Sequence, residues 1–215
     1  MKTLNQYIKE KLIINKDYRD NTIVVKSFDE LRKIIEDRYD KLGEGTEQNP
    51  IDFNDIDVSN LDSFYSNTYY KGLFSGTKFK YIDISDWDVS NVKSMRHMFW
   101  SCEKLELAGD LSNWDVSNVN DMSHMFHGCK YFNKDISGWD VKKVTNMYSM
   151  FYDCKLFNQD LSSWNVSNVT DMAQMFRGCR SFNQDISSWN VSKVIYKNGA
   201  FNNCPIKNEY KPKFK

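Results

Sequence analysis

The sequence predicts an α/β repeat protein: a solenoid of stacked coils, each with short strands and a short helix. Two observations lead to this prediction. Tryptophan recurs at spacings of 27, 25, 25 and 25 residues, at Trp87, Trp114, Trp139, Trp164 and Trp189. Cysteine keeps the same spacings, at Cys102, Cys129, Cys154, Cys179 and Cys204. Two uncommon residue types thus share one period, and a period between about 20 and 50 residues is typical of a stacked-repeat architecture.

Composition excludes several classes of partner. The 215 residues contain 29 basic and 29 acidic side chains, so no net charge attracts the chain to nucleic acid or to an anionic membrane. No apolar run approaches the ~18 residues that span a bilayer. The first residues alternate charged and apolar side chains and lack the apolar core of a signal peptide. We therefore expect a cytoplasmic protein without a nucleic-acid or membrane partner.

Residues 1–42 predict a helix–strand–helix unit. Thr3 and Gln6 form a capping box ahead of a helix over 3–14, and the β-branched run at 21–26 predicts a strand. Ser27 and Glu30 form a second capping box, followed by helically spaced apolar residues. We favour a cap on the first coil, because an uncovered end exposes core side chains and strand edges. The alternative is a docking unit.

The rest of the chain divides into three parts. Residues 43–50 are polar and rich in turn formers, which predicts a linker. The repeat pattern covers 51–206, about six coils of which the first and last are irregular. Residues 207–215 carry four lysines and one glutamate. We expect this basic segment to be a solvated tail, with a docking tail as the alternative.

One coil, 135–157, shows two kinds of apolar spacing. The first half mixes β-type residues with Asp, Ser and Gly, which suits short strands and tight turns, at Ile136, Trp139, Val141 and Val144. The second half has apolar residues at steps of three, one and three, at Met147, Met150, Phe151 and Cys154. That spacing predicts one face of a short helix. Stacked coils would pair their strands in parallel and build a shared core.

Polar residues also recur in columns, meaning the same position in successive coils. An Asp column precedes a Ser by two residues, at Asp83, Asp110, Asp135, Asp160 and Asp185. We predict Asx turns there, with calcium as the alternative, although calcium needs six or more oxygens. Asn133, Asn158 and Asn183 predict a buried asparagine ladder. The five cysteines predict reduced, buried thiols, with disulfides between coils ~4.8 Å apart as the alternative.

The repeat pattern is D-[IL]-S-x-W-[DN]-V-S-x-V-x-x-M-x-x-M-F-x-x-C-x-x-F-N, carried by 135–158, 160–183 and 185–204. It resembles the BspA-like leucine-rich-repeat surface proteins of bacteria and mycoplasmas, many of them lipoproteins. The resemblance covers 51–206 and implies a leucine-rich-repeat-type solenoid that binds proteins or host surfaces, without catalytic residues. This sequence differs in showing no signal peptide or lipid-anchor cysteine. That favours an intracellular copy, virion-associated if the chain is phage-encoded.

The three histidines, His97, His124 and His127, should lie close together by register. A histidine metal site is one interpretation, but no carboxylate or cysteine joins them on the exposed side. We therefore favour exposed, variable surface residues. We predict no metal and no cofactor.

The position after the core Phe should point outward, and it holds Trp100, His127, Tyr152, Arg177 and Asn202. Nearby outward positions add Arg96, Tyr131, Tyr148 and Arg180. Exposed Trp, Tyr and Arg are enriched in binding hot spots, which predicts a contact face for another protein. The alternative is that large side chains merely shield the neighbouring helices.

No Ser/His/Asp set, phosphate loop or zinc signature appears in the sequence. We therefore predict a non-enzymatic module, bacterial or phage-encoded, that recognises another protein. The alternative is a structural component of a larger assembly, such as a phage particle or an adhesin-like surface protein. Self-association would favour that alternative.

Overall fold

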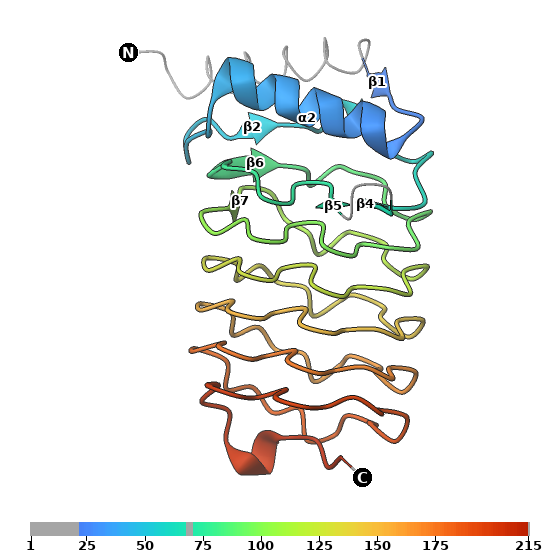
Figure 1. The fold of residues 1–215 in the computed structure, drawn as a ribbon, viewed down its shortest axis with the longest axis vertical. Helices are drawn as coiled ribbons and strands as arrows, with labels where there is room; N and C mark the ends of the chain where they lie inside the picture. The colour runs from blue at the N-terminus through green and yellow to red at the C-terminus, as the bar shows by residue number, and fades with distance from the viewer. Residues whose placement is uncertain (1–21, 68–70, 215) are drawn as a thin grey trace, which may run out of the picture.

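The computed structural model describes residues 22–67 and 71–214 (Figure 1). Within them the elements are short, and most lie before residue 108. In chain order they are β1 (Ile23–Val24), α2 (Phe28–Leu42), β2 (Ile51–Asp52), β3 (Ile56–Asp57), β4 (Tyr65–Ser66), β5 (Lys71–Gly72), β6 (Tyr81–Asp83), β7 (Glu106–Leu107) and the 3-10 helix η1 (Asn208–Tyr210).

The predicted fold class, a leucine-rich-repeat-type α/β solenoid of parallel strands and short helices, is wrong. The described residues contain a single α-helix, α2, and it precedes the repeats. The strands form three small separate sheets, β1-β3, β2-β6-β7 and β4-β5. The first two sheets are parallel, whereas β4 and β5 pair antiparallel.

Left-handed residues explain why the repeats have no helices. In the segment 147–154, Ser149 and Asp153 have φ angles of 53° and 54°. An α-helix of L-residues cannot continue through such positions. His97, His124 and Gln174 have the same left-handed backbone in their repeats. The steps of three, one and three therefore arise from a succession of tight turns.

Backbone hydrogen bonding alternates along the same segment. Every second N–H bonds to a carbonyl of the next repeat at 2.8–3.0 Å, in the pairs Met147–Asp171, Ser149–Ala173, Phe151–Met175 and Asp153–Arg177. The N–H groups of Met150, Tyr152 and Cys154 bond instead to the carbonyl three residues back. The chain thus satisfies its backbone partly within a repeat and partly between repeats.

Successive repeats lie side by side and in register. Parallel bridges link single residues from one repeat to the next, through Ser63, Ser94, Asp121, Asn146, Asp171 and Tyr196. Figure 1 shows the corresponding segments as layers along the long axis of the molecule. Along this column the pairing is limited to one-residue bridges, so the repeats form no extended strand there.

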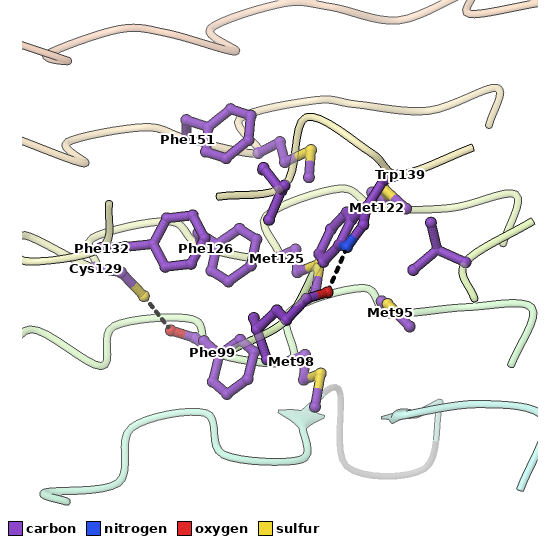
Figure 2. Packing of buried hydrophobic residues seen from close by; sticks show 14 of the residues in the cluster. Met95, Met98, Phe99, Met122, Met125, Phe126, Cys129, Phe132, Trp139 and Phe151 are labelled. Carbon is purple, nitrogen blue, oxygen red and sulfur yellow. Dashed lines mark hydrogen bonds between the residues drawn. The ribbon is translucent and has the colours of Figure 1, made fainter. Parts of the chain in front are cut away.

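Register places identical apolar side chains above one another in the core. The rings of one phenylalanine column stack at centroid distances of 5.4–5.9 Å, through Phe74, Phe99, Phe126, Phe151, Phe176 and Phe201. Figure 2 shows Phe99, Phe126 and Phe151 in this arrangement. Tryptophan rings stack likewise, Trp114 on Trp139 at 6.3 Å and Trp164 on Trp189 at 6.4 Å. Such near-parallel stacks add to the energy of apolar burial.

Polar atoms inside this core donate to the preceding repeat. The indole N–H of Trp139 donates to the carbonyl of Leu111 at 2.9 Å, and the other four column tryptophans make the equivalent bond. The thiol of Cys129 donates to the carbonyl of Phe99 at 3.1 Å (Figure 2). All five cysteines are free thiols, as predicted, and burial raises the pKa of Cys102 to about 12.

The Asp column forms the predicted Asx turns. Asp135 Oδ1 accepts the N–H of Ser137 at 2.9 Å, and the other four column members make the same bond at 2.9–3.0 Å. Bonds of this kind lower the pKa of Asp110, Asp135 and Asp185. Each carboxylate is thereby stabilised within its own turn, which offsets repulsion along the column.

The asparagine ladder also forms, but at the surface. Asn133 Oδ1 accepts the N–H of Asn158 at 2.9 Å, and Asn158 Oδ1 accepts that of Asn183 at 3.0 Å. Asn133 and Asn158 are exposed and Asn183 is half-buried, so the prediction of a buried ladder is wrong. The side-chain amide oxygens still accept hydrogen bonds from backbone N–H groups of the turns. At the surface, water can hydrogen-bond to the remaining amide atoms.

Helix α2 lies across one end of the layers (Figure 1). The predicted capping box is confirmed at its start, where Ser27 Oγ accepts the N–H of Glu30 at 3.2 Å. Leu31 and Ile35 are fully buried against the repeat core, and Arg38 pairs with Asp55 at 2.6 Å. The strand predicted at 21–26 is β1, which pairs with β3. The helix predicted at 3–14 lies outside the described residues.

Residues 206–214 pack on the last repeat, unlike the solvated tail expected from their charge. The carbonyl of Tyr210 in η1 accepts the N–H of Ile186 at 3.0 Å. Pro212 is buried, and the ring of Phe214 lies 6.4 Å from that of Phe201. The burial of the aromatic and proline side chains that lie between the lysines therefore favours packing more strongly than solvation of the charges favours a free tail.

Truncation of a stacked core ring should destabilise the whole protein. Phe151→Ala removes a fully buried ring that contacts rings in both neighbouring repeats. We expect a loss of about 3–5 kcal/mol in the free energy of unfolding, measured by urea denaturation. The control Tyr131→Ala, at a side chain that is 52 % exposed, should change it by less than about 0.5 kcal/mol. Equal effects would contradict this description of the core.

The thiols should differ in reactivity according to burial. The raised pKa values of Cys102, Cys129, Cys154 and Cys179 keep these thiols protonated and unreactive at about pH 8. Cys204 is only half-buried and should react first with a disulfide reagent. In denaturing guanidinium all five thiols should react with the reagent. Fast reaction of four or more thiols in the native protein would refute this account.

Candidate functional site

Register also collects large side chains on the outside of the layers. We call this set the aromatic stripe: Tyr65, Arg96, His97, Trp100, His124, His127, Tyr148, Tyr152 and Arg177. One row of rings runs from Tyr65 to His97 at 5.4 Å, to His124 at 4.6 Å and to Tyr148 at 4.7 Å. A second row runs from Trp100 to His127 at 6.2 Å and to Tyr152 at 4.4 Å. The rows meet where His97 contacts Trp100 and His124 contacts His127.

The backbone beneath the stripe is held by bonds between repeats. The N–H of His97 donates to the carbonyl of Ser123 at 3.0 Å, and that of His124 to the carbonyl of Tyr148 at 2.8 Å. Both histidines have left-handed φ angles, 55° and 57°. These turns direct long side chains outward while the adjacent Met98 and Phe99 stay buried. The stripe is therefore a fixed feature of the fold.

A guanidinium group lies over a tyrosine ring at each end of the stripe. The Arg96 guanidinium carbon is 5.0 Å from the ring centre of Tyr65, and that of Arg177 is 5.5 Å from the ring centre of Tyr152. Both contacts are within the range of cation–π attraction. The stripe thus combines aromatic surface with two positive charges.

Leaving Asn202 aside, eight of the outward residues were predicted as contact residues, and six of them belong to this network: Trp100, His127, Tyr152, Arg177, Arg96 and Tyr148. Tyr131 and Arg180 are also exposed, but they follow the core cysteine of their repeats and take no part in the ring contacts of the stripe. Tyr65, His97 and His124 were not among the predicted contact residues. Tyr65 was missed because it lies in the irregular first repeat. The bridge from Ser63 to Ser94 places it in the column of Arg96.

Exposure varies along the stripe. Trp100 is 40 % exposed, a high value for so large an apolar side chain. Tyr148, Tyr152 and the three histidines are half-buried, each covered on one side by a neighbouring ring. The predicted shielding of helices does not apply, since the repeats have none. The rings shield one another and leave one side to solvent, except for Tyr65, which is only 9 % exposed.

Burial keeps the histidines neutral. It lowers the pKa of His97 to about 4, with Arg96 adding to the effect, and that of His124 to about 3, with His97 and His127 adding. Burial also lowers the pKa of His127. The Nδ1 atoms of His124 and His127 lie 3.4 Å apart, which suits one donor and one acceptor in neutral rings. Near pH 7 the imidazoles therefore act as aromatic surface.

The register prediction for the histidines is confirmed, since the ring of His124 contacts those of both His97 and His127. The expectation that they are exposed is wrong, because all three are half-buried. Among residues 22–67 and 71–214, no group of three or more His, Cys, Asp and Glu side chains is arranged to hold a metal ion. The contacts of the imidazoles are with rings and with each other. Their geometry suits contact with a ligand surface.

Acid should weaken the fold through these histidines. The unfolded chain binds protons near the ordinary pKa of 6.5, whereas folded His97 and His124 bind them only near 4 and 3. Stability is therefore lost as pH falls below about 6.5 and levels off near the folded pKa values. We expect Tm to fall on the order of 5 °C between about pH 7 and about pH 4.5.

The double variant His97→Asn/His124→Asn tests the cause of that loss. Asparagine tolerates the left-handed backbone and does not titrate in this range. The fall in Tm should shrink markedly in the variant. An unchanged fall would assign the acid sensitivity to other groups.

Comparison with known proteins identifies one family. The family model described as "Mycoplasma protein of unknown function, DUF285" matches residues 47–108 and 106–213. No curated protein and no solved structure matches the chain. Within the described part of the chain, no helix has the length and apolar character needed to cross a membrane. The two matches together span most of the sequence, so the chain belongs to the DUF285 family of Mycoplasma proteins.

Proposed function

We propose that this protein is a non-enzymatic module that recognises another protein through the aromatic stripe. The observation that carries the proposal is the continuous run of ring contacts across adjacent repeats, with Trp100 40 % exposed. Trp, Tyr and Arg are enriched in binding hot spots. Trp and Tyr bury a large area at a low cost in side-chain entropy, and Arg donates several hydrogen bonds from one planar group. Here all three types occur in one contiguous set.

The stripe is also well ordered before binding. Its residues are held by ring stacking and by backbone bonds between repeats, such as His97 N–H to Ser123 O. A surface that is already ordered loses little conformational entropy on association. This supports recognition of a partner by a rigid face.

The chemistry of the nucleophile candidates also favours a non-enzymatic role. The cysteines donate their thiol protons to core carbonyls, and burial raises the pKa of Cys129 well above its ordinary value. Such thiols are poor nucleophiles. The repeat pattern resembles that of BspA-like surface proteins, and we propose that the chain shares their protein-binding role.

A structural role in a larger assembly is the second candidate, favoured by the last repeat. Within the described chain, the N–H groups of Gly199, Phe201 and Asn203 make no hydrogen bond. Their counterparts in the preceding repeat, at Gln174, Phe176 and Gly178, bond to this last repeat. Ile195 and Tyr196 are 68 % and 60 % exposed nearby. A second molecule could add to this edge.

Affinity capture with matched variants tests the recognition role. The stripe variant Trp100→Ala/Tyr152→Ala/Arg177→Ala should lose at least about tenfold of the partner that wild type retains, because it removes three hot-spot side chains. The control Lys193→Ala/Ile195→Ala/Tyr196→Ala removes comparable exposed side chains from the last repeat. It should retain the partner. Both variants must first show wild-type circular dichroism.

The other outcomes separate the two candidates. Retention of the partner by the stripe variant would refute the stripe as the contact face. Sedimentation that shows concentration-dependent oligomers, lost in the last-repeat variant alone, would instead support the assembly role.

A further inference from the structure

The arginines of the described chain differ in whether they have an acidic partner. On α2, Arg32 pairs with Glu36 at 2.8 Å and Arg38 pairs with Asp55 at 2.6 Å. Arg96, Arg177 and Arg180 make no ion pair within residues 22–67 and 71–214. All three lie on the stripe or directly beside it. Their positive charge is therefore available to a ligand.

Two polar groups at the same place lack any hydrogen-bond partner. The Nε of Arg96 and the Oγ of Ser123 are buried and unpaired, and Ser123 is only 2 % exposed. These residues occupy one column in adjacent repeats, and His97, next to Arg96, bonds to the carbonyl of Ser123. Buried polar groups are almost always paired in native proteins. A ligand that draws the Arg96 side chain outward would give its unpaired Nε a partner.

The flank of the stripe adds further positive charge. Lys130 pairs with Glu103, and Lys155 lies close enough to lower the pKa of Glu103 as well. Arg180 continues the column of Lys130 and Lys155 in the next repeat. The carboxylates near the stripe are Glu103, which pairs with Lys130, and Asp121 and Asp153, which act on His97 and His127. None of them forms an ion pair with Arg96, Arg177 or Arg180.

We propose that the stripe binds an acidic, extended polypeptide segment, with its carboxylates received by the guanidinium groups of Arg96, Arg177 and Arg180. This inference rests on the proposed function and names the class of partner. A guanidinium edge supplies paired N–H donors of the kind that carboxylates prefer. A small rotamer change, common at interfaces, brings the Arg96 Nε to the ligand.

A second copy of this chain is a poorer fit. Its acidic columns are engaged in their own Asx turns, as where Asp135 accepts the N–H of Ser137. If the arginines of one copy bound these carboxylates of the other, the carboxylates would lose the hydrogen bonds that stabilise their turns. A flexible segment with free Asp and Glu side chains carries no such cost, and it can follow the stripe across several repeats.

Selection from a displayed library of random dodecapeptides tests the inference. Wild-type protein is the bait, and the variant Arg96→Gln/Arg177→Gln/Arg180→Gln is the comparison. Selected peptides should carry net negative charge and bind the variant at least about tenfold more weakly. Their affinity for wild type should also fall between about 50 mM and about 300 mM salt.

A matched control separates local from global charge. The variant Lys142→Gln/Lys143→Gln/Lys193→Gln removes the same number of positive charges at exposed turns outside the stripe. It should bind the selected peptides like wild type. Equal weakening in both variants would overturn the inference, because net charge alone would then explain binding.

The remaining outcomes are also decisive. Neutral or basic peptides that bind through Trp100 would overturn the acidic partner while leaving the recognition role intact. No stripe-dependent peptide at all would refute the inference, and the affinity capture above decides the recognition role separately.

Discussion

The structure depends on one constraint: every second N–H of the segment 147–154 and its counterparts must reach a carbonyl of the next repeat. Those bonds hold successive repeats in a fixed register, seen in the bridge from Asn146 to Asp171. The intervening N–H groups close tight turns within the repeat. Left-handed residues such as Ser149 and Asp153 make that alternation sterically possible. An insertion within this segment would break the bonds on both sides. The 27-residue step from Trp87 to Trp114 keeps them, as in the bond from His97 N–H to the carbonyl of Ser123, because its two extra residues lie outside the segment.

A fixed register places each side chain next to the same residue type in the adjacent repeats. For apolar rings this is favourable, and Phe126 lies 5.5 Å from Phe99 and 5.9 Å from Phe151. For polar groups it is costly unless each one is satisfied locally. The carboxylate of Asp135 accepts a bond within its own turn, and the indole N–H of Trp139 donates to the repeat before it. The repeated polar residues are therefore those that solve this problem.

The sequence allowed much of this arrangement to be predicted, since the period, the Asx turns, the buried thiols and the start of α2 all follow from residue type and spacing. The helices predicted in the repeats were wrong because steps of three, one and three suit both a helix and a series of turns. Only backbone dihedrals distinguish the two, and non-glycine residues such as His124 and Ser149 conceal them. Tyr65 was missed since irregular spacing hid its column. The expectation of a solvated tail was wrong because it rested on the lysines and left out the apolar side chains of Pro212 and Phe214.

The same constraint limits which positions can differ between repeats. A change in an inward column would disturb the core, and a change in a turn column would leave backbone groups without hydrogen bonds, so the outward positions are the ones free to differ. There the chain places rings that shield each other and arginines that lack carboxylates, at Arg96 and Arg177. Zero net charge excluded strongly charged partners only for the molecule as a whole. Because register separates acidic turn columns from cationic outward ones, a neutral repeat protein still presents a local surface that suits an acidic partner.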